Sequence, residues 1–224
     1  MTHDDPFVRT RLALHAVAEH LLAGDLHRTT GRIGLRRTPG GFGQPEHQSA
    51  DGQRRRLRIE GTSLVVLDGD VERWRPLTTL AAAAEDAGTT LGTPAGVYEP
   101  ETSPDPAEAL DLDVAAAARL AEFYAFVEEV LEEVRSRHAH QAPAIVQLWP
   151  EHFDLACNLG EVNLGGSPGD AGHDEPYLYV GPWTQREGAF WNEPWGAGQP
   201  WSAVPTVDAA VAFLVEGLAE AGVR

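Results

Sequence analysis

The chain has 224 residues, of which 42% are hydrophobic and 23% are charged, so it can bury a full core as one large domain or two small ones. Its net charge of −17 at pH 7 argues against nucleic acid as a partner, because an acidic surface repels phosphate. All 17 basic residues are arginine, and the absence of lysine excludes Schiff-base chemistry and the lysine of phosphate-binding P-loops.

The sequence shows no sign of secretion or of membrane insertion. No apolar run approaches the ~20 residues of a membrane helix, and the start MTHDDPFVR lacks the apolar region of a secretory signal. The single cysteine, Cys157, excludes an internal disulfide and suits a reducing compartment. We therefore expect a cytoplasmic protein that has no membrane partner.

The N-terminal region is predicted to form a helix followed by short strands. Apolar residues recur at helical spacing between residues 6 and 25, and Gly31 is a natural end for this helix. Segment 32–36 is predicted to be a short strand and the glycine-rich segment 38–45 a loop. Residues 54–70 alternate in the manner of a β-hairpin whose turn lies near Gly61.

The middle of the chain contains the clearest helix. Residues 114–137 carry an apolar stripe at helical spacing with glutamates on the other face, and Asp113 suits the N-cap. Before it, residues 78–87 are alanine-rich and are predicted to be a short helix. Residues 88–111 are rich in Pro, Gly, Thr and Asp without periodicity, which predicts a long loop or a linker.

The C-terminal half is predicted to contain strands, an aromatic loop at 184–204 and a last helix capped by Thr206. The connections between strands are too short for parallel crossovers, so we expect an α+β fold with mainly antiparallel sheets flanked by about four helices. Residues 1–224 are expected to form a single compact unit, with 1–110 and 111–224 as an alternative subdivision. The predicted strands are 144–149, 152–158, 161–165 and 176–181.

The segment from Trp149 to Trp201 holds the candidate functional residues. It contains five of the six tryptophans and two of the four tyrosines, among many Asp, Glu, His, Gly and Pro residues. Bulky aromatic rings beside carboxylates and imidazoles suit a pocket for a small polar ligand. The expected ligand-binding residues are His152, Asp154, Asp170, His173, Glu175, Tyr177, Tyr179, Trp183, Trp191 and Trp195.

Strand parity motivates this choice. On a strand, residues i and i+2 face the same way, so His152 and Asp154 would project together. Glu175, Tyr177 and Tyr179 would share a face in the same manner if their strand begins early enough. The alternative is that the tryptophans of the following loop fold over the sheet and fill a core.

The same imidazoles and carboxylates suggest a divalent metal site. If the strands lie close together, His152, Asp154, His173 and Glu175, with Asp170 nearby, offer nitrogen and oxygen ligands for Zn²⁺, Mn²⁺ or Fe²⁺. The alternative is that Asp170 caps a turn and His152 hydrogen-bonds to backbone. No other cofactor is expected.

A serine hydrolase is excluded by the context of its only matching motif. GGSPG, at residues 165–169, fits the literal pattern G-x-S-x-G around Ser167. The residue after the nucleophile normally donates its N–H to the oxyanion hole, and here that residue is Pro168, which has no N–H.

Several segments together resemble a family of uncharacterised bacterial proteins that carries a domain of unknown function. These segments are TTGRIGLRRTPGGFG (29–43), QLWPEHFDLACNLG (147–160), SPGD followed by EPYLYVGPW (167–183), and FWNEPWGA (190–197). The resemblance covers essentially the whole chain. It implies no established activity, substrate or cofactor.

Three classes of function follow from these patterns. The first is binding of a small polar molecule in a pocket of the C-terminal aromatic and acidic block. The second is a metal-dependent hydrolase or lyase that uses the same side chains. The third is an interaction module that forms a homodimer through the tryptophan-rich loop, for which Trp191 and Trp195 are the residues to test.

Overall fold

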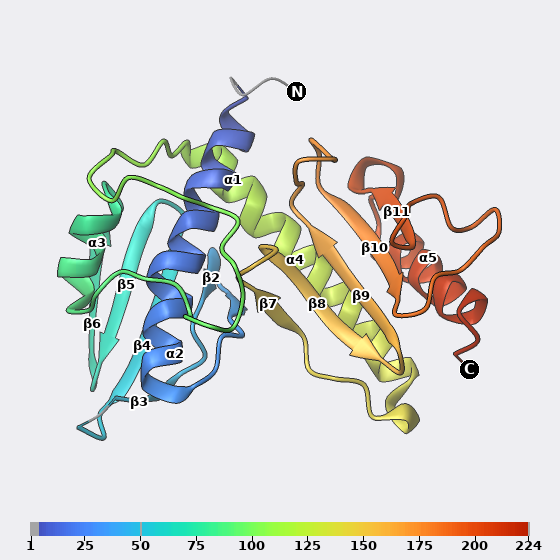
Figure 1. Ribbon diagram of the computed structural model, residues 1–224, viewed down its shortest axis with the longest axis horizontal. Helices are drawn as coiled ribbons and strands as arrows, with labels where there is room; N and C mark the ends of the chain where they lie inside the picture. The colour runs from blue at the N-terminus through green and yellow to red at the C-terminus, as the bar shows by residue number, and fades with distance from the viewer. Residues whose placement is uncertain (1–4, 50, 224) are drawn as a thin grey trace. The chain divides into compact units, whose positions relative to one another are not determined.

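The computed structural model describes residues 5–49 and 51–223, which fall into two compact units (Figure 1). Its helices and two antiparallel sheets confirm the predicted α+β class. Among the described residues, no helix is both long enough and apolar enough to cross a membrane. The first unit comprises Met1–Glu122 and Leu148–Phe153, and the second comprises Phe123–Gln147 and Asp154–Arg224.

Two elements contribute residues to both units. These are helix α4 (Val114–Arg137), whose bounds match the prediction, and the short strand β7 (Gln147–Trp149). The division between the units therefore lies inside α4 and not at residue 110.

The first unit begins with one continuous helical segment. Helix α1 (Pro6–Val17) continues through a π-helical segment, η1 (Ala18–Ala23), into α2 (Gly24–Thr30). Asp5 caps the start by accepting a hydrogen bond from the N–H of Phe7 at 2.8 Å.

The segment ends at Gly31, as predicted, where the backbone is left-handed with a φ of 73°. Gly24 weakens the helical pattern in the sequence, but the helix continues through it, and the glycine has a packing role there. A Cβ at Gly24 would lie 1.8 Å from the carbonyl oxygen of Gly92, so the glycine admits a close approach of the following loop.

The sheet of the first unit has the order β1-β2-β4-β5-β6, and β3 also pairs with β4. The predicted hairpin is confirmed, with Gly61 in its turn at a φ of 57°. Figure 1 shows the N-terminal helical segment lying across this sheet. The strands are β1 (Arg36–Thr38), β2 (Gly41–Gly43), β3 (His47–Gln48), β4 (Arg54–Glu60), β5 (Ser63–Asp68) and β6 (Val71–Pro76).

Two predictions for the edge of this sheet are wrong. Strand β1 begins at Arg36, so segment 32–36 is not a strand of its own, although Leu35 forms an isolated bridge with Leu148. Strand β2 lies inside the predicted loop 38–45. A Cβ at Gly43 would lie 2.4 Å from the Cβ of Arg58, so the glycine lets β2 pair closely with β4.

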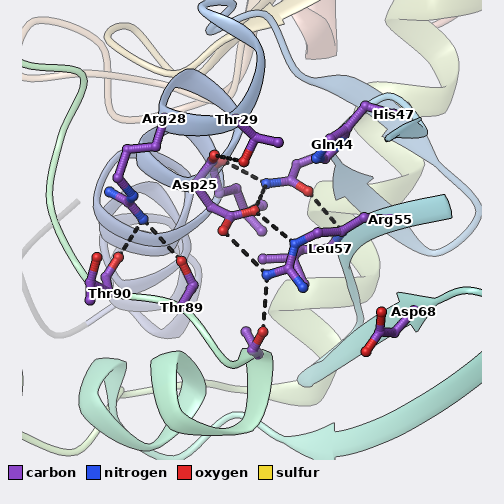
Figure 2. Close-up of polar contacts among 12 residues, drawn as sticks. Asp25, Arg28, Thr29, Gln44, His47, Arg55, Leu57, Asp68, Thr89 and Thr90 are labelled. Atoms are coloured by element: carbon purple, nitrogen blue, oxygen red, sulfur yellow. Dashed lines mark hydrogen bonds and ion pairs between the residues drawn. The ribbon is translucent and has the colours of Figure 1, made fainter. Parts of the chain in front are cut away.

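A buried polar network ties α2 to the sheet (Figure 2). Asp25 accepts hydrogen bonds from Gln44 Nε2 at 2.9 Å and from the Arg55 guanidinium at 3.2 Å. The same Gln44 side chain accepts the N–H of Leu57 and donates to the carbonyl oxygen of Leu22, both at 2.9 Å. These bonds compensate for the burial of Asp25, which stabilises the packing of helix on sheet.

A short helix and a long loop complete the chain of the first unit before α4. Helix α3 (Leu80–Ala87) is capped by Thr79, whose Oγ1 accepts the N–H of Ala82 at 3.0 Å. Residues 88–113, the long loop, contain no helix and only an isolated bridge, in agreement with the prediction.

The sheet of the second unit places β8, β9, β10 and β11 side by side in antiparallel order. The elements are β8 (Asp154–Leu159), β9 (Val162–Ser167), β10 (Tyr177–Pro182), β11 (Ala197–Pro200), the 3₁₀ turns η2 (Ala139–Gln141) and η3 (Trp201–Ala203), and α5 (Val207–Glu220). Thr206 caps α5 as predicted. The prediction of a loop over residues 184–204 is partly wrong, because this segment contains β11 and η3.

Helices α4 and α5 pack on one face of this sheet. A Cβ at Gly166 on β9 would lie 2.5 Å from Val127 of α4, and a Cβ at Gly217 of α5 would lie 2.6 Å from Val180 on β10. Gly166 pairs with Leu178, which has the same parity as Val180, so both helices cover the same face. The opposite face carries the residues of the candidate site.

Candidate functional site

Tyr177 and Tyr179 point to the face of the second sheet opposite α4 and α5, because successive residues of a strand alternate. The register pairs Tyr179 with Gly165 on β9 and with Gly198 on β11. A Cβ at Gly165 would lie 2.5 Å from Cζ of Tyr179, so the phenol ring lies directly against this glycine. Gly165 thus makes room for the ring of Tyr179, whereas a Cβ at Gly198 would lie 3.2 Å from Cη2 of Trp195, so this second glycine makes room for the indole.

Each of these tyrosines holds a carboxylate. The Tyr177 hydroxyl donates to Oδ2 of Asp170 at 2.6 Å, and the Tyr179 hydroxyl donates to Oδ2 of Asp154. Asp154 is the buried first residue of β8, whereas Asp170 lies in the turn after β9. The phenols therefore fix two carboxylates on the same side of the sheet.

The imidazole of His173 lies between two carboxylates. Its Nε2 is 3.1 Å from Oε1 of Glu193 and its Nδ1 is 3.4 Å from Oδ1 of Asp170. Oδ1 of Asp170 also accepts the N–H groups of Gly172 at 2.7 Å and of His173 at 2.9 Å. These bonds and a ring contact with Tyr177, at a centroid distance of 4.6 Å, fix the orientation of the imidazole.

Trp195 completes the aromatic surface. Its ring centroid lies 6.0 to 6.3 Å from those of Tyr179, Tyr177 and His173. The turn that carries it is held because the Asn192 side chain accepts the N–H of Gly198 at 2.9 Å and donates to its carbonyl oxygen at 3.0 Å. Trp195 is nevertheless 40% exposed, so part of its ring faces solvent.

The electrostatics of the site follow from these contacts. Burial raises the pKa of Asp170, but hydrogen bonds from Tyr177, Gly172 and His173 outweigh it and leave that pKa below its usual value. Burial lowers the pKa of His173, whereas Glu193 and Asp170 raise it more, so the net pKa is above its usual value. The site therefore favours an ionised carboxylate beside a protonated imidazole.

Three other predicted residues lie elsewhere in the second unit. Glu175 precedes β10, and one of its oxygens accepts a hydrogen bond from Ser202 Oγ at 3.2 Å. Trp183 is 65% exposed, and its Nε1 donates to Asn163 Oδ1 at 3.2 Å. Trp191 packs edge-on against Phe190 at a centroid distance of 4.9 Å, as a packing residue would.

The predicted same-face pair of His152 and Asp154 is wrong, because β8 begins only at Asp154. His152 lies in the preceding turn, and Phe153 between the two has a φ of 53°, which breaks the strand alternation. His152 belongs to the first unit, is 67% exposed at its side chain, and has its Nδ1 3.4 Å from Oε1 of Glu101.

Within residues 5–49 and 51–223, no group of three or more His, Cys, Asp or Glu side chains is placed to hold a metal ion. In the second unit, the carboxylates of Asp170 and Glu193 contact the imidazole of His173. The metal-dependent hydrolase or lyase stays a prediction. Elemental analysis of protein purified without chelator tests it, since about one Zn, Mn or Fe per chain would favour it.

One carboxylate and two glycines that form part of this face were not identified from the sequence. Glu193 was not among the expected ligand-binding residues, although it contacts His173 more closely than Asp170 does. Gly165 and Gly198 were missed because a glycine carries no side-chain signal. The parity of β9 and β11 relative to Tyr179 would have identified both glycines, had the strand register been known.

The chain was compared with protein-family models, with curated proteins and with solved structures, and no match was found. The resemblance to an uncharacterised bacterial family therefore stays a prediction, and the function has to be argued from the site.

Proposed function

We propose that the second unit binds a small polar ligand on the face formed by Asp170, His173, Tyr177, Glu193 and Trp195. The observation that carries this proposal is the exposure of Trp195, 40% of which faces solvent although three aromatic rings surround it. An indole of this kind presents a flat apolar surface beside charged groups, as many sites for small polar molecules do.

The polar groups beside Trp195 define the chemistry of the ligand. The side chains of Asp170, His173 and Glu193 are 39%, 31% and 25% exposed, so each retains contact with solvent. Carboxylates accept hydrogen bonds from hydroxyl or amino groups, and a protonated imidazole donates them. A ligand with one flat face and several such groups fits best: a sugar, an organic cation or a nitrogen heterocycle.

The site is also held in place before any ligand arrives. Asp170 accepts hydrogen bonds from the Tyr177 hydroxyl and from the backbone N–H groups of Gly172 and His173. The Asn192 side chain fixes the turn that carries Trp195. Side chains fixed in this way lose little further conformational entropy on binding. Because the side chains around it are already fixed, the exposed indole of Trp195 is better explained by a binding role than by a purely structural one.

The experiment that tests the proposal is a thermal-shift and tryptophan-fluorescence titration with one probe from each class. The probes are methyl α-glucoside, choline and adenosine at millimolar concentration. We expect at least one probe to raise the Tm of the wild type. Trp195→Ala and Asp170→Asn should abolish that rise, whereas Trp183→Ala, which removes a more exposed indole of the same unit, should keep it.

Two outcomes would reject this function. One is the absence of any response of the wild type to all three probes. The other is a response that Trp195→Ala retains in full, since the ligand would then bind elsewhere. Folded Trp195→Ala protein, verified by circular dichroism, is required for either comparison.

A second candidate function is contact with another copy of the chain, which the exposure of Trp183 and Trp195 favours. Sedimentation velocity over a hundredfold range of concentration tests it. A dimer that Trp195→Ala converts to a monomer would support this role, and a monomer at every concentration would reject it.

A further inference from the structure

The face of the second sheet that carries Tyr179 and Trp195 continues along β10 to another exposed indole, that of Trp183. The backbone N–H of Trp183 donates to the carbonyl oxygen of Glu161 at 2.8 Å, which extends the pairing of β10 with β9 by one residue. Strand alternation then places the side chains of Tyr179 and Trp183 on the same face. The hydrogen bond from Trp183 Nε1 to Asn163 Oδ1 agrees with this placement, because Asn163 has the parity of the residue that pairs with Tyr179 on β9.

The chain that follows Trp183 is anchored on the other side of the sheet. Arg186 donates to the carbonyl oxygen of Ala221, at the C-terminal end of α5, at 2.8 Å. The ring of Phe190 stacks on that of Phe213 of α5 at a centroid distance of 5.5 Å. Because α5 packs on the opposite face, these contacts draw the segment away from the face that carries Trp183. The indole of Trp183 accordingly remains 65% exposed.

Two asparagine amides lie beside this indole. Asn158 on β8 pairs with Asn163 on β9, which in turn pairs with Gly181 on β10. Oδ1 of Asn163 accepts hydrogen bonds from Trp183 Nε1 at 3.2 Å and from Asn158 Nδ2 at 3.1 Å. Asn158 Nδ2 also donates to the carbonyl oxygen of Val162 at 3.2 Å. Since an indole N–H can only donate, it fixes the Asn163 amide with its oxygen toward Trp183 and its NH₂ group away from it.

These bonds leave one donor and one acceptor of the amide pair available to a ligand. Among the described residues, neither Nδ2 of Asn163 nor Oδ1 of Asn158 has a hydrogen-bond partner. Asn163 is exposed and Asn158 is half-buried, so both side chains reach solvent. A neutral donor beside a neutral acceptor is complementary to hydroxyl groups, each of which can both donate and accept.

The sheet surface between the two indoles is open. Gly181 lies between Tyr179 and Trp183 on the same face, and the nearest atom to a Cβ at Gly181 would lie 3.8 Å away. The carbonyl oxygen of Trp195 lies 3.9 Å from that Cβ position, so Trp195 borders the same space. At ~3.3 Å per residue, the chain from Tyr179 to Trp183 spans roughly 13 Å. This span is longer than a single sugar ring and comparable with a short chain of linked rings.

We propose that the binding face of the second unit extends along β10 as far as Trp183, and that its ligand is a neutral oligosaccharide. One sugar ring lies on Trp195 beside the charged groups described above. A later ring lies on Trp183 and bonds to the available amide groups of Asn163 and Asn158. An indole offers a flat apolar surface to the C–H face of a sugar ring, while the amides satisfy its hydroxyl groups. This inference rests on the proposed function, since the ring on Trp195 belongs to that site.

Two other ligands with flat faces fit this extended face less well. A single-stranded nucleic acid stacks its bases on aromatic rings, but the net charge of −17 repels its phosphates. An organic cation would use the carboxylates near Trp195 but would leave the neutral amides near Trp183 without a role.

Isothermal titration of the full chain with trisaccharides and with their monomers tests the inference. The trisaccharides are maltotriose and cellotriose, which are compared with glucose, and triacetylchitotriose, which is compared with N-acetylglucosamine. We expect at least one trisaccharide to bind about tenfold or more tightly than its monomer, because the longer chain contacts both indoles.

Three variants locate the second indole's contribution. Trp183→Ala should reduce the ratio of trisaccharide to monomer affinity to near one. Asn163→Asp should weaken trisaccharide binding by about threefold or more, since it keeps the oxygen that accepts the indole N–H of Trp183 but removes the NH₂ donor. Trp74→Ala removes an indole that is 48% exposed in the first unit, and this control should leave the ratio unchanged.

Failure of this inference can be told apart from failure of the proposed function. If a small probe raises the Tm of the wild type and Trp195→Ala abolishes the rise, the site exists. Trisaccharides that bind no more tightly than their monomers would then overturn only the oligosaccharide inference. A gain from chain length that Trp183→Ala retains in full would overturn it as well. A dimer that Trp183→Ala dissociates would also overturn it, because the indole would then be buried between two copies of the chain.

Discussion

The hydroxyl of Tyr179 donates a hydrogen bond to the carboxylate of Asp154, which links β10 to the first residue of β8 across the strand between them. Asp154 is only 5% exposed, so water contributes little to its solvation. A carboxylate in such a place depends on the donors that the protein supplies. This bond is therefore a stabilising contact of the second sheet as well as part of the candidate site.

Replacing Tyr179 by Phe should lower the free energy of unfolding by about 1–3 kcal/mol, because it removes a donor from a buried carboxylate. Urea denaturation followed by circular dichroism measures the change. The same substitution in an Asp154→Asn background should cost much less, since a neutral amide depends less on that donor. Equal losses in the two backgrounds would show that the phenol stabilises the sheet by packing alone.

Gly165→Ala should destabilise the second unit by about 1–3 kcal/mol, because the new methyl group would lie 2.5 Å from Cζ of Tyr179 and the ring would have to move. Gly181→Ala is the control in the same sheet, because the nearest atom to its Cβ would lie 3.8 Å away. Urea denaturation of both variants compares them. If the two cost the same, the ring of Tyr179 does not depend on the glycine at 165.

Elements with a strong local signal could be predicted from the sequence alone. The bounds of α4 match the prediction because its apolar stripe and the capping residue Asp113 lie within the helix or next to it. The hairpin turn at Gly61 and the helix end at Gly31 are also local, since both require a left-handed backbone that glycine readily adopts.

Strands that form only through pairing could not be predicted. Strand β2 (Gly41–Gly43) and strand β11 (Ala197–Pro200) have no alternating apolar pattern. Each exists because a neighbouring strand supplies hydrogen bonds and because glycine allows the close approach. This information lies in the partner strand and not in the segment itself.

The candidate site could be predicted only where it depends on one local segment. The parity of Tyr177 and Tyr179 is a property of one strand and is correct. His152 was placed on a strand because nothing in the local sequence announces the left-handed Phe153. The contact between His173 and Glu193 spans 20 positions of the chain, so no local pattern could reveal it.

Asp170→Asn should lower the pKa of His173, because the imidazole loses one of the two carboxylates that stabilise its protonated form. A pKa raised on folding contributes stability below the unfolded value, near 6.5, and this contribution is lost as the pH rises through the folded value. NMR titration of the His173 ring protons measures the shift. A pKa that does not change in Asp170→Asn would mean that Glu193 alone sets it.

Asp25 should make the stability of the first unit sensitive to acid. Burial raises the pKa of Asp25, but hydrogen bonds from Gln44, Thr89 and Arg55 outweigh it and leave that pKa below its usual value. A pKa lowered on folding contributes stability above the unfolded value, near 4, and this contribution is lost as the pH falls through the folded value.

Asp25→Asn should therefore lower the free energy of unfolding at pH 7 by about 1–3 kcal/mol and flatten its decline below pH 4. Asp68→Asn is the control in the region of Figure 2, because Asp68 is 47% exposed and its Oδ2 lies 3.6 Å from Arg73 Nη2. Exposed ion pairs contribute little, so this control should change stability by less than about 1 kcal/mol. Urea denaturation at a series of pH values compares the variants with the wild type. If Asp25→Asn and the wild type lose stability in parallel as the pH falls, another carboxylate carries the acid sensitivity, and the network around Asp25 serves only to pack α2 on the sheet.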